Sequence, residues 1–453
     1  MIADPLTLGI LGLAALVLLI VLRLPVAYAM ILVGGVGTSL LYGPTIFLGQ
    51  LKTLAYGQFS IYGLSVVPVF VLMGAMATRS GLSSDLFRAA HAWLGWLRGG
   101  MAMAAIAACA GFGAVCGSSL ATASTMGRVA LPELARYGYH PRLATGTLAA
   151  GGVLGILIPP SVVLVIYAIV VEASVVTLFM AALIPGVLAV LLFVAAIAVT
   201  IRLRPDLAPP GAAPDRAERW RATRDVVPVL AVFGLVVGGM YAGFYNPTPA
   251  ASVGVFLVGI LWWWRRRPGP AELADALLET ARTTGMIYLV VFGAEMLKIF
   301  MARTGTPQAA AAWIVEAGLP PLAVILLFLA ALVLLGCLMD SLSMILLVVP
   351  FFWPVLAEIN GGPFQPAEGA AFGLATEDLK IWFGILALVV VELGLVTPPV
   401  GLNVFVIAAL AEGVPMAEVF RGVVPFFLAE MVRVALLLAF PALTLWLPRV
   451  LGG

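Results

Sequence analysis

The chain has 453 residues, of which 63% are hydrophobic and only 10% charged, far from the balance of a soluble domain. This composition excludes an ordinary soluble enzyme and predicts an all-α polytopic membrane protein. The net charge of +2 gives no sign of a nucleic-acid partner, and the three cysteines lack the CxxC spacing of a disulfide or metal motif. Walker-type, HExxH and GxSxG signatures are absent, so neither enzyme activity nor a cofactor is expected.

Apolar runs long enough to span a membrane follow one another along the chain. The expected spans are 6–22, 25–42, 62–78, 143–171, 177–200, 226–244, 249–264, 285–302, 380–410 and 422–447. The first run has no basic residues before it and no cleavage pattern, so we expect a spanning helix rather than a removed signal peptide.

Two further apolar segments, 99–136 and 320–356, carry a polar cluster in their middle. The clusters are Ser118–Ser119 and Asp340–Ser341. Polar backbone at membrane depth is tolerated only where it is buried in protein or lines a cavity. The pattern therefore predicts two re-entrant hairpins rather than two long spans.

Two of the expected spans are interrupted by a double proline, in GILIPPS (155–161) and in GLVTPPV (394–400). Proline lacks a backbone N–H and clashes with the preceding turn, so each helix must unwind there. Paired breaks in the two halves of a membrane protein point to a transporter's binding site. The alternative is that they are only packing kinks, which are common in membrane helices.

Short matches at a constant displacement of 224 residues, such as Arg79–Gly81 with Arg303–Gly305, indicate a duplication. We predict a first repeat at 1–204, a cytoplasmic linker at 205–225 and a second repeat at 226–453. Each repeat would have five spans and one hairpin, and this odd number of spans inverts the second repeat. Short arginine-rich connections then fall on the cytoplasmic side, as expected for a membrane protein.

The polar groups near the breaks are mostly small and neutral, and their oxygens suit a hard cation such as sodium. The expected sodium ligands are Ser118, Ser119, Gly155, Ile158 and Pro160 at one site, and Asp340, Ser341, Gly394, Thr397 and Val400 at the other. Helix N-termini at the same places would present N–H groups to an anionic substrate. The expected substrate contacts are Ser119, Ser161, Ser341, Pro399 and Asn403.

Charged residues within the apolar segments need a reason, because a central charge costs roughly 2.5–3.5 kcal/mol on insertion scales. Asp340 is therefore expected to bind a cation or hold its hairpin tip. Glu430 and Arg433 are three residues apart, as are Glu295 and Lys298, so local ion pairs are expected. Glu392 precedes the second break, and its role stays open.

Three long runs resemble the large membrane subunit (DctM-like) of TRAP transporters. They are GFGAVCGSSLATASTMGRVALPEL (111–134), LATGTLAAGGVLGILIPPS (143–161) and GLVTPPVGLNVFVIA (394–408). The resemblance covers essentially the whole chain, and it implies sodium-coupled uptake of a small organic acid, such as a dicarboxylate or a sialic acid. It also implies an elevator mechanism, with a scaffold and a moving transport domain, in a bacterial or archaeal cytoplasmic membrane.

The resemblance further implies two protein partners beside the membrane lipid. One is a small four-helix membrane subunit (DctQ-like), expected on a separate chain, and the other is a periplasmic substrate-binding protein. The family's sodium regions fall on the ligands named above, although the second hairpin, CLMDSLSMILLVVP (337–350), matches less distinctively.

Three other functions compete with this one. A stand-alone sodium–anion symporter of the wider hairpin-containing superfamily would work without a binding protein. An intramembrane enzyme would use Asp340 and Glu392 as an acid–base pair, but no catalytic signature accompanies them. A purely structural scaffold would not require paired broken helices.

Overall fold

The computed structural model describes residues 4–211 and 215–452, and within these ranges it is helical, with no strand. Seven helices are long and apolar enough to cross a membrane, or eight if the bent pair in the first half counts as one span. The protein is therefore a multi-pass membrane protein, as its composition predicts.

The helices of the first half follow the expected order. They are α1 (Pro5–Val21), α2 (Val26–Tyr42), α3 (Pro44–Phe59), α4 (Val66–Ser80), α5 (Leu82–Leu94), α6 (Gly100–Cys116), α7 (Ser119–Arg136), α8 (Pro141–Leu157), α9 (Val162–Val171) and α10 (Val175–Leu203). The hairpin expected at 99–136 is the pair α6–α7, and the broken helix at 143–171 is the pair α8–α9, bent by 45°.

The second half contains the corresponding hairpin and break. Its helices are α11 (Arg216–Phe233), α12 (Gly239–Tyr241), α13 (Pro247–Arg266), α14 (Pro270–Thr304), α15 (Thr306–Glu316), α16 (Pro321–Gly336), α17 (Ser341–Asn360), α18 (Thr376–Gly394), α19 (Leu402–Leu410), α20 (Met416–Ala439) and α21 (Ala442–Leu451). The pair α16–α17 occupies the stretch of the second expected hairpin, although α17 is itself one of the seven helices long and apolar enough to cross a membrane. The span expected at 380–410 is divided into α18 and α19, with residues 395–401 between them.

The structure differs from the expected spans in several places. Helices α3, α5 and α15 occupy stretches where no span is expected. The single span expected at 422–447 is divided into α20 and α21 around Pro441, which cannot continue the backbone hydrogen bonds of a helix. The expected linker is partly helical, because α11 already begins at Arg216.

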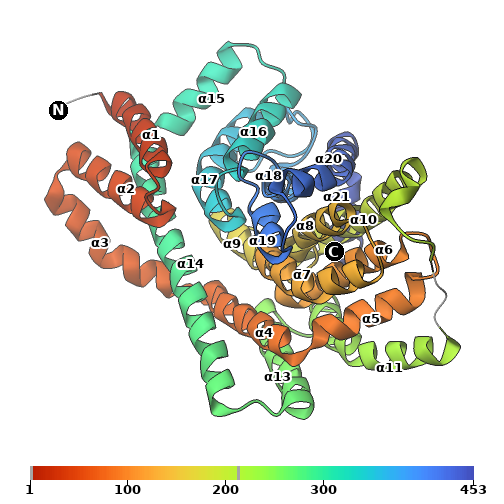
Figure 1. Cartoon of the computed structure of the whole chain (residues 1–453). Helices are drawn as coiled ribbons and strands as arrows, with labels where there is room; N and C mark the ends of the chain where they lie inside the picture. Colours follow the sequence, from red (N-terminus) through yellow and green to blue (C-terminus); the bar gives the residue numbers. More distant parts are fainter. Residues whose placement is uncertain (1–3, 212–214, 453) are drawn as a thin grey trace.

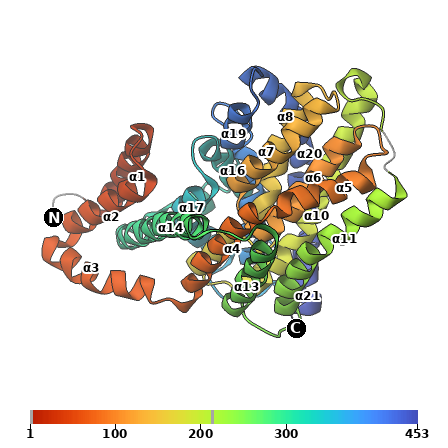
Figure 2. The ribbon, with the colours of Figure 1, turned by 60° about the horizontal axis from the view of Figure 1, so that its bottom comes forward.

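Most of the helices belong to two groups, which Figures 1 and 2 show from two directions, and α5 and α11 pack along the outside. Helices α6–α10 and α16–α21 form a compact group, here called the core body, which contains both hairpins and both breaks. Helices α1–α4, α13 and α14 form the flanking body, in which α2 packs on α14 and α4 packs on α13. The hairpin arms α6 and α16 have 17 and 16 residues, at the short end of what spans a bilayer core of about 30 Å, whereas α17 with 20 residues is long enough to cross it.

Glycines let the hairpins approach the broken helices within the core body. A Cβ atom on Gly113 of α6 would lie 2.6 Å from the Cα of Gly155 in α8. In the second half, a Cβ on Gly394 of α18 would lie 2.7 Å from the Cα of Gly336 in α16. Such close helix contacts need small residues, so each hairpin is fastened to its own broken helix by a glycine pair.

Candidate functional site

The tip of the first hairpin is a short turn between α6 and α7. Gly117 adopts φ +65°, the left-handed conformation that commonly ends a helix at glycine. Ser118 then caps α7, because its Oγ accepts a hydrogen bond from the Ala121 N–H at 3.4 Å. The sequence Gly-Ser thus stops one helix and starts the next at the predicted position.

The first break lies directly against this tip. Residues 158–161 are all buried, and Ser161 caps α9 by accepting a hydrogen bond from the Leu164 N–H at 3.3 Å. A Cβ on Gly117 would lie 2.8 Å from the carbonyl oxygen of Pro160, and a Cβ on Gly155 would lie 2.6 Å from that of Ser118. Three of the predicted ligands of the first site, Ser118, Gly155 and Pro160, therefore lie where the tip meets the break.

Thr122 belongs to this cluster, although it is not among the predicted ligands. Its hydroxyl would lie 2.4 Å from a Cβ on Gly155, and it is buried without a hydrogen-bond partner among the described residues. A buried unpaired hydroxyl is costly unless something binds it. Its position one helical turn after Ser118 and Ser119 is the sequence feature that could have identified it.

The tip of the second hairpin is held by two side-chain hydrogen bonds. Asp340 caps α17, its Oδ2 accepting from the Ser343 N–H at 3.1 Å. Ser341 donates from Oγ to Oε1 of Glu392 in α18 at 2.6 Å. Glu392 is 0% exposed, and its Oε2 has no partner among the described residues. The role left open for Glu392 is thus a contact with the tip, which joins α17 to α18.

The second break is more open than the first. Pro398 and Pro399 are exposed, and Thr397 and Val400 are half-buried. The Thr397 hydroxyl donates to the Leu393 carbonyl at 2.6 Å, which leaves its oxygen lone pairs able to accept.

Asn403 turns away from the second tip. It is 0% exposed, and its side-chain NH₂ lies 3.5 Å from the carbonyl oxygen of Ala149 in α8. Its helix, α19, packs on α7 and α8 of the first half. Asn403 therefore supports the first broken helix rather than the cavity between the tips.

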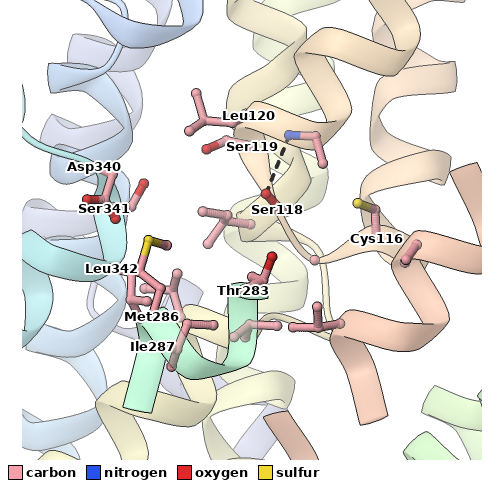
Figure 3. Close-up of a pocket in the computed structure, with 18 of the residues that line it drawn as sticks. Cys116, Ser118, Ser119, Leu120, Thr283, Met286, Ile287, Asp340, Ser341 and Leu342 are labelled. Carbon is pink, nitrogen blue, oxygen red and sulfur yellow. Dashed lines mark hydrogen bonds between the residues drawn. The ribbon is translucent and has the colours of Figure 1, made fainter. Parts of the chain in front are cut away.

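A cavity of about 210 Å³ lies where the two hairpin tips meet the flanking body. Figure 3 shows Ser118 and Ser119 on one side and Asp340 and Ser341 on the other, with Thr283 and Met286 of α14 between them. Gly74 and Thr78 of α4 complete that wall. We call this space the tip cavity.

The tip cavity brings together only part of the predicted substrate set. Ser119 and Ser341 line it, whereas Ser161, Pro399 and Asn403 do not. The N-termini of α7 and α17 both lie at its rim, so their first N–H groups and positive dipole ends are near the space between the tips. The carboxylate of Asp340 also lines the cavity and already caps α17, so the arrangement suits a small anionic ligand that is bound together with a cation.

The expected local ion pairs are confirmed. Arg433 pairs with Glu430 inside the core body, where both side chains are almost fully buried, and Arg433 also approaches the Pro185 carbonyl of α10 at 3.4 Å. Lys298 lies 3.4 Å from Glu295 in the flanking body. Among the described residues, no group of three His, Cys, Asp or Glu is placed to hold a metal ion.

Comparisons with known proteins agree with the resemblance seen in the sequence. A family model described as "Tripartite ATP-independent periplasmic transporter, DctM component" matches residues 13–443. The C4-dicarboxylate TRAP transporter large permease protein DctM of Pseudomonas aeruginosa is 33% identical over 92% of this chain and 93% of its own. The sialic acid TRAP transporter large permease protein SiaM of Vibrio cholerae is 29% identical over 88% of each chain.

A solved structure supports the fold at lower sequence similarity. The YdaH transporter of Alcanivorax borkumensis superimposes with a TM-score of 0.60, covering 87% of this chain and 89% of its own, at 15% identity. At that identity the similarity supports the fold alone.

Proposed function

Because the chain belongs to the DctM component family of TRAP transporters, we propose that it carries a small organic acid into the cell with sodium. The membrane would be the cytoplasmic membrane of a bacterium or archaeon. The observation that carries the proposal is the tip cavity, which both hairpins and two helix N-termini line with hydroxyl and N–H groups. Relatives named for C4-dicarboxylate and for sialic acid support a carboxylate as the shared chemical group.

Sodium would bind at the two breaks and order the tips. At the first break, Gly155 lies against the Ser118 carbonyl and Gly117 against the Pro160 carbonyl, with the unpaired Thr122 hydroxyl beside Gly155. At the second break, the backbone after Gly394 and the Thr397 hydroxyl offer oxygens. An ion bound at each break favours one position of the adjacent tip and so completes the pocket for the acid.

The division into two bodies supports an elevator movement. The core body holds both tips and both breaks, while the flanking body supplies only one wall of the tip cavity. Loaded with acid and sodium, the core body would slide against the flanking body as the transport domain. Inward movement of one net positive charge releases about 2.3 kcal/mol per 100 mV, so a dianion needs more than two sodium ions for voltage to drive its uptake.

The system would include two further proteins. A small four-helix membrane subunit would pack beside the flanking body, and a periplasmic binding protein would deliver the acid. The two relatives carry different substrate names, so substrate choice would depend strongly on that binding protein. The inverted repeats would give each hairpin access from a different side of the membrane.

Uptake by proteoliposomes tests the proposal. The chain is co-reconstituted with its small subunit and binding protein, and labelled succinate and sialic acid are supplied with and without an inward sodium gradient. We expect uptake of at least one acid that needs both sodium and the binding protein. Uptake without the binding protein would support a stand-alone symporter, and uptake independent of sodium by the complete complex would overturn the coupling.

Two variants connect that result with the tip cavity. Ser119→Ala and Ser341→Ala each remove a hydroxyl that lines it. We expect uptake to fall by about tenfold or more in both. Ser119→Ala loses a donor to the acid, where a hydrogen bond to a charged group contributes roughly 1.5–3 kcal/mol, and Ser341→Ala deprives the buried Glu392 of its hydrogen-bond donor. Thr53→Ala is the control, since this exposed hydroxyl of α3 donates only to its own helix. Normal uptake by both cavity variants would place the acid elsewhere.

A further inference from the structure

A second cavity adjoins the tip cavity. Its volume is about 480 Å³, and Arg79, Asp275, Leu278, Glu279, Arg282 and Thr283 line it. Glu279 and Thr283 also line the tip cavity, so the two spaces share a boundary formed by one turn of α14. Arg79 lies at the end of α4 that the arginine distribution places on the cytoplasmic side. We call this second space the vestibule.

An ion pair between α4 and α14 marks the boundary. Arg79 Nη1 lies 2.7 Å from Glu279 Oε2, and the same nitrogen donates to the Ala75 carbonyl at 3.0 Å. Ala75 and Glu279 both line the tip cavity. The Arg79 side chain is 28% exposed and that of Glu279 54%, so the pair is accessible from the vestibule.

The vestibule is lined by two arginines and two acids. Arg79 pairs with Glu279, whereas Arg282 and Asp275 make no ion pair within the ranges 4–211 and 215–452. The tip cavity itself contains no cationic side chain, although Asp340 and Glu279 line it. An acid leaving the tips for the cytoplasm would therefore meet its first guanidinium groups at Arg79 and Arg282.

We propose that Arg79 and Arg282 form a carboxylate-binding site in the vestibule, where a departing acid displaces Glu279 from Arg79. The planar guanidinium offers several donors that match a carboxylate, and Glu279 occupies it when no acid is present. An exposed ion pair contributes only about 0–1 kcal/mol, so an incoming carboxylate can exchange with Glu279 readily. This inference rests on the proposed function, because it assigns the path by which the transported acid is released.

The local preference for anions can be measured without knowing the transported acid. A Thr283→Cys variant of the full chain, in inside-out membrane vesicles, reports the charge at the boundary between the cavities. Its labelling rate is compared for two methanethiosulfonate reagents, one ending in a sulfonate and the other in a trimethylammonium group. Mass spectrometry of the peptide that contains position 283 separates this reaction from any at the buried native cysteines.

We expect Arg79→Gln, added to Thr283→Cys, to lower the sulfonate-to-ammonium rate ratio by about threefold or more, because charges in a cleft focus the local field. Glu279→Gln breaks the same ion pair but leaves the cation, so it should raise the ratio. Arg79→Lys should keep the ratio near its starting value. Arg449→Gln is the matched control, since it breaks another ion pair between distant segments, 2.6 Å from Asp378.

The inference is overturned if Arg79→Gln and Glu279→Gln shift the ratio in the same direction, or if neither shifts it. Either result would show that the ion pair only fastens α4 to α14. The labelling ratio needs no transported acid, so a failure of sodium-driven uptake leaves this test intact. If the labelling ratio changes as expected while sodium-driven uptake fails, the carboxylate-binding site is supported and the proposed sodium coupling is rejected.

Discussion

The two broken helices have similar sequences but different surroundings. Residues 158–161 of the first break are buried, and the tip of the first hairpin covers them, with Gly117 facing the Pro160 carbonyl. In the second break, Pro398 and Pro399 are exposed. The double proline is thus buried in the first half and exposed in the second. We infer that in this conformation ions exchange more easily at the second break.

The two halves also fasten their tips differently. In the second half, Ser341 of the tip donates to the buried Glu392. Counting back by the distance between the double prolines, the first half has Val153 at the position of Glu392. There the tip is held by close backbone contacts at Gly117 and Gly155 instead. A side-chain hydrogen bond can be exchanged for a ligand more easily than backbone packing can, so the second tip is the better candidate for a gate.

The largest effect is expected from filling the glycine contacts. Gly155→Ala puts a Cβ within 2.6 Å of the Ser118 carbonyl, and Gly394→Ala puts one within 2.7 Å of Gly336 backbone atoms. Overpacking typically costs about 1–3 kcal/mol, so both variants should lose thermal stability in detergent and most uptake. Gly155→Ala should lower stability and uptake more than Gly394→Ala, because the first break is buried whereas the second is exposed. Gly234→Ala, with no atom within 4 Å of the new Cβ, is the control.

A smaller effect is expected from the Glu392 hydrogen bond. Glu392→Leu leaves the Ser341 hydroxyl without its partner, at a cost of about 1–3 kcal/mol, and should raise the sodium concentration for half-maximal uptake by about tenfold. Glu392→Gln retains a hydrogen-bond acceptor and should change this sodium concentration less. Val153→Leu, at the corresponding place in the first half, is the matched comparison. Equal sodium dependence in Glu392→Leu and the parent protein would refute the gate assigned to this hydrogen bond.

The smallest effect concerns access to the two breaks. Ser161→Cys and Val400→Cys place a thiol at corresponding positions, one fully buried and the other half-buried. Thiol reactivity follows exposure, so Val400→Cys should react about fivefold faster or more with a small water-soluble maleimide in permeabilised membranes. Comparable rates at both positions would contradict the difference between a sealed and an open break.

Much of this architecture could be predicted from the residues alone. The double prolines and the polar clusters within apolar segments locate both hairpins and both breaks, because proline and buried polar groups have strong local consequences. Helices α3, α5 and α15 cannot be predicted as spans, since none of them is long and apolar enough to cross a membrane. The contacts of Ser341 with Glu392 and of Arg79 with Glu279 join segments far apart in the chain, and no periodicity reveals such pairs.

The candidate site shows the same limit. Ser118, Ser119, Asp340 and Ser341 were found because each tip is a local sequence feature, and all four line the tip cavity. Asn403 was assigned to the substrate from its position after the second break, but α19 directs it toward α8. The packing of the second half of the chain on the first decides which residues face the cavity, and this depends on the whole fold.

The central claim, that acid and sodium meet between the two tips, is tested most directly by protection of a cysteine in the tip cavity. Leu342→Cys places a thiol in the cavity wall at a position that supplies no predicted ligand. Our account predicts that the transported acid slows its alkylation only when sodium is present, and that Glu392→Leu weakens this protection. Protection by the acid to the same extent without sodium, or no protection under either condition, would contradict it.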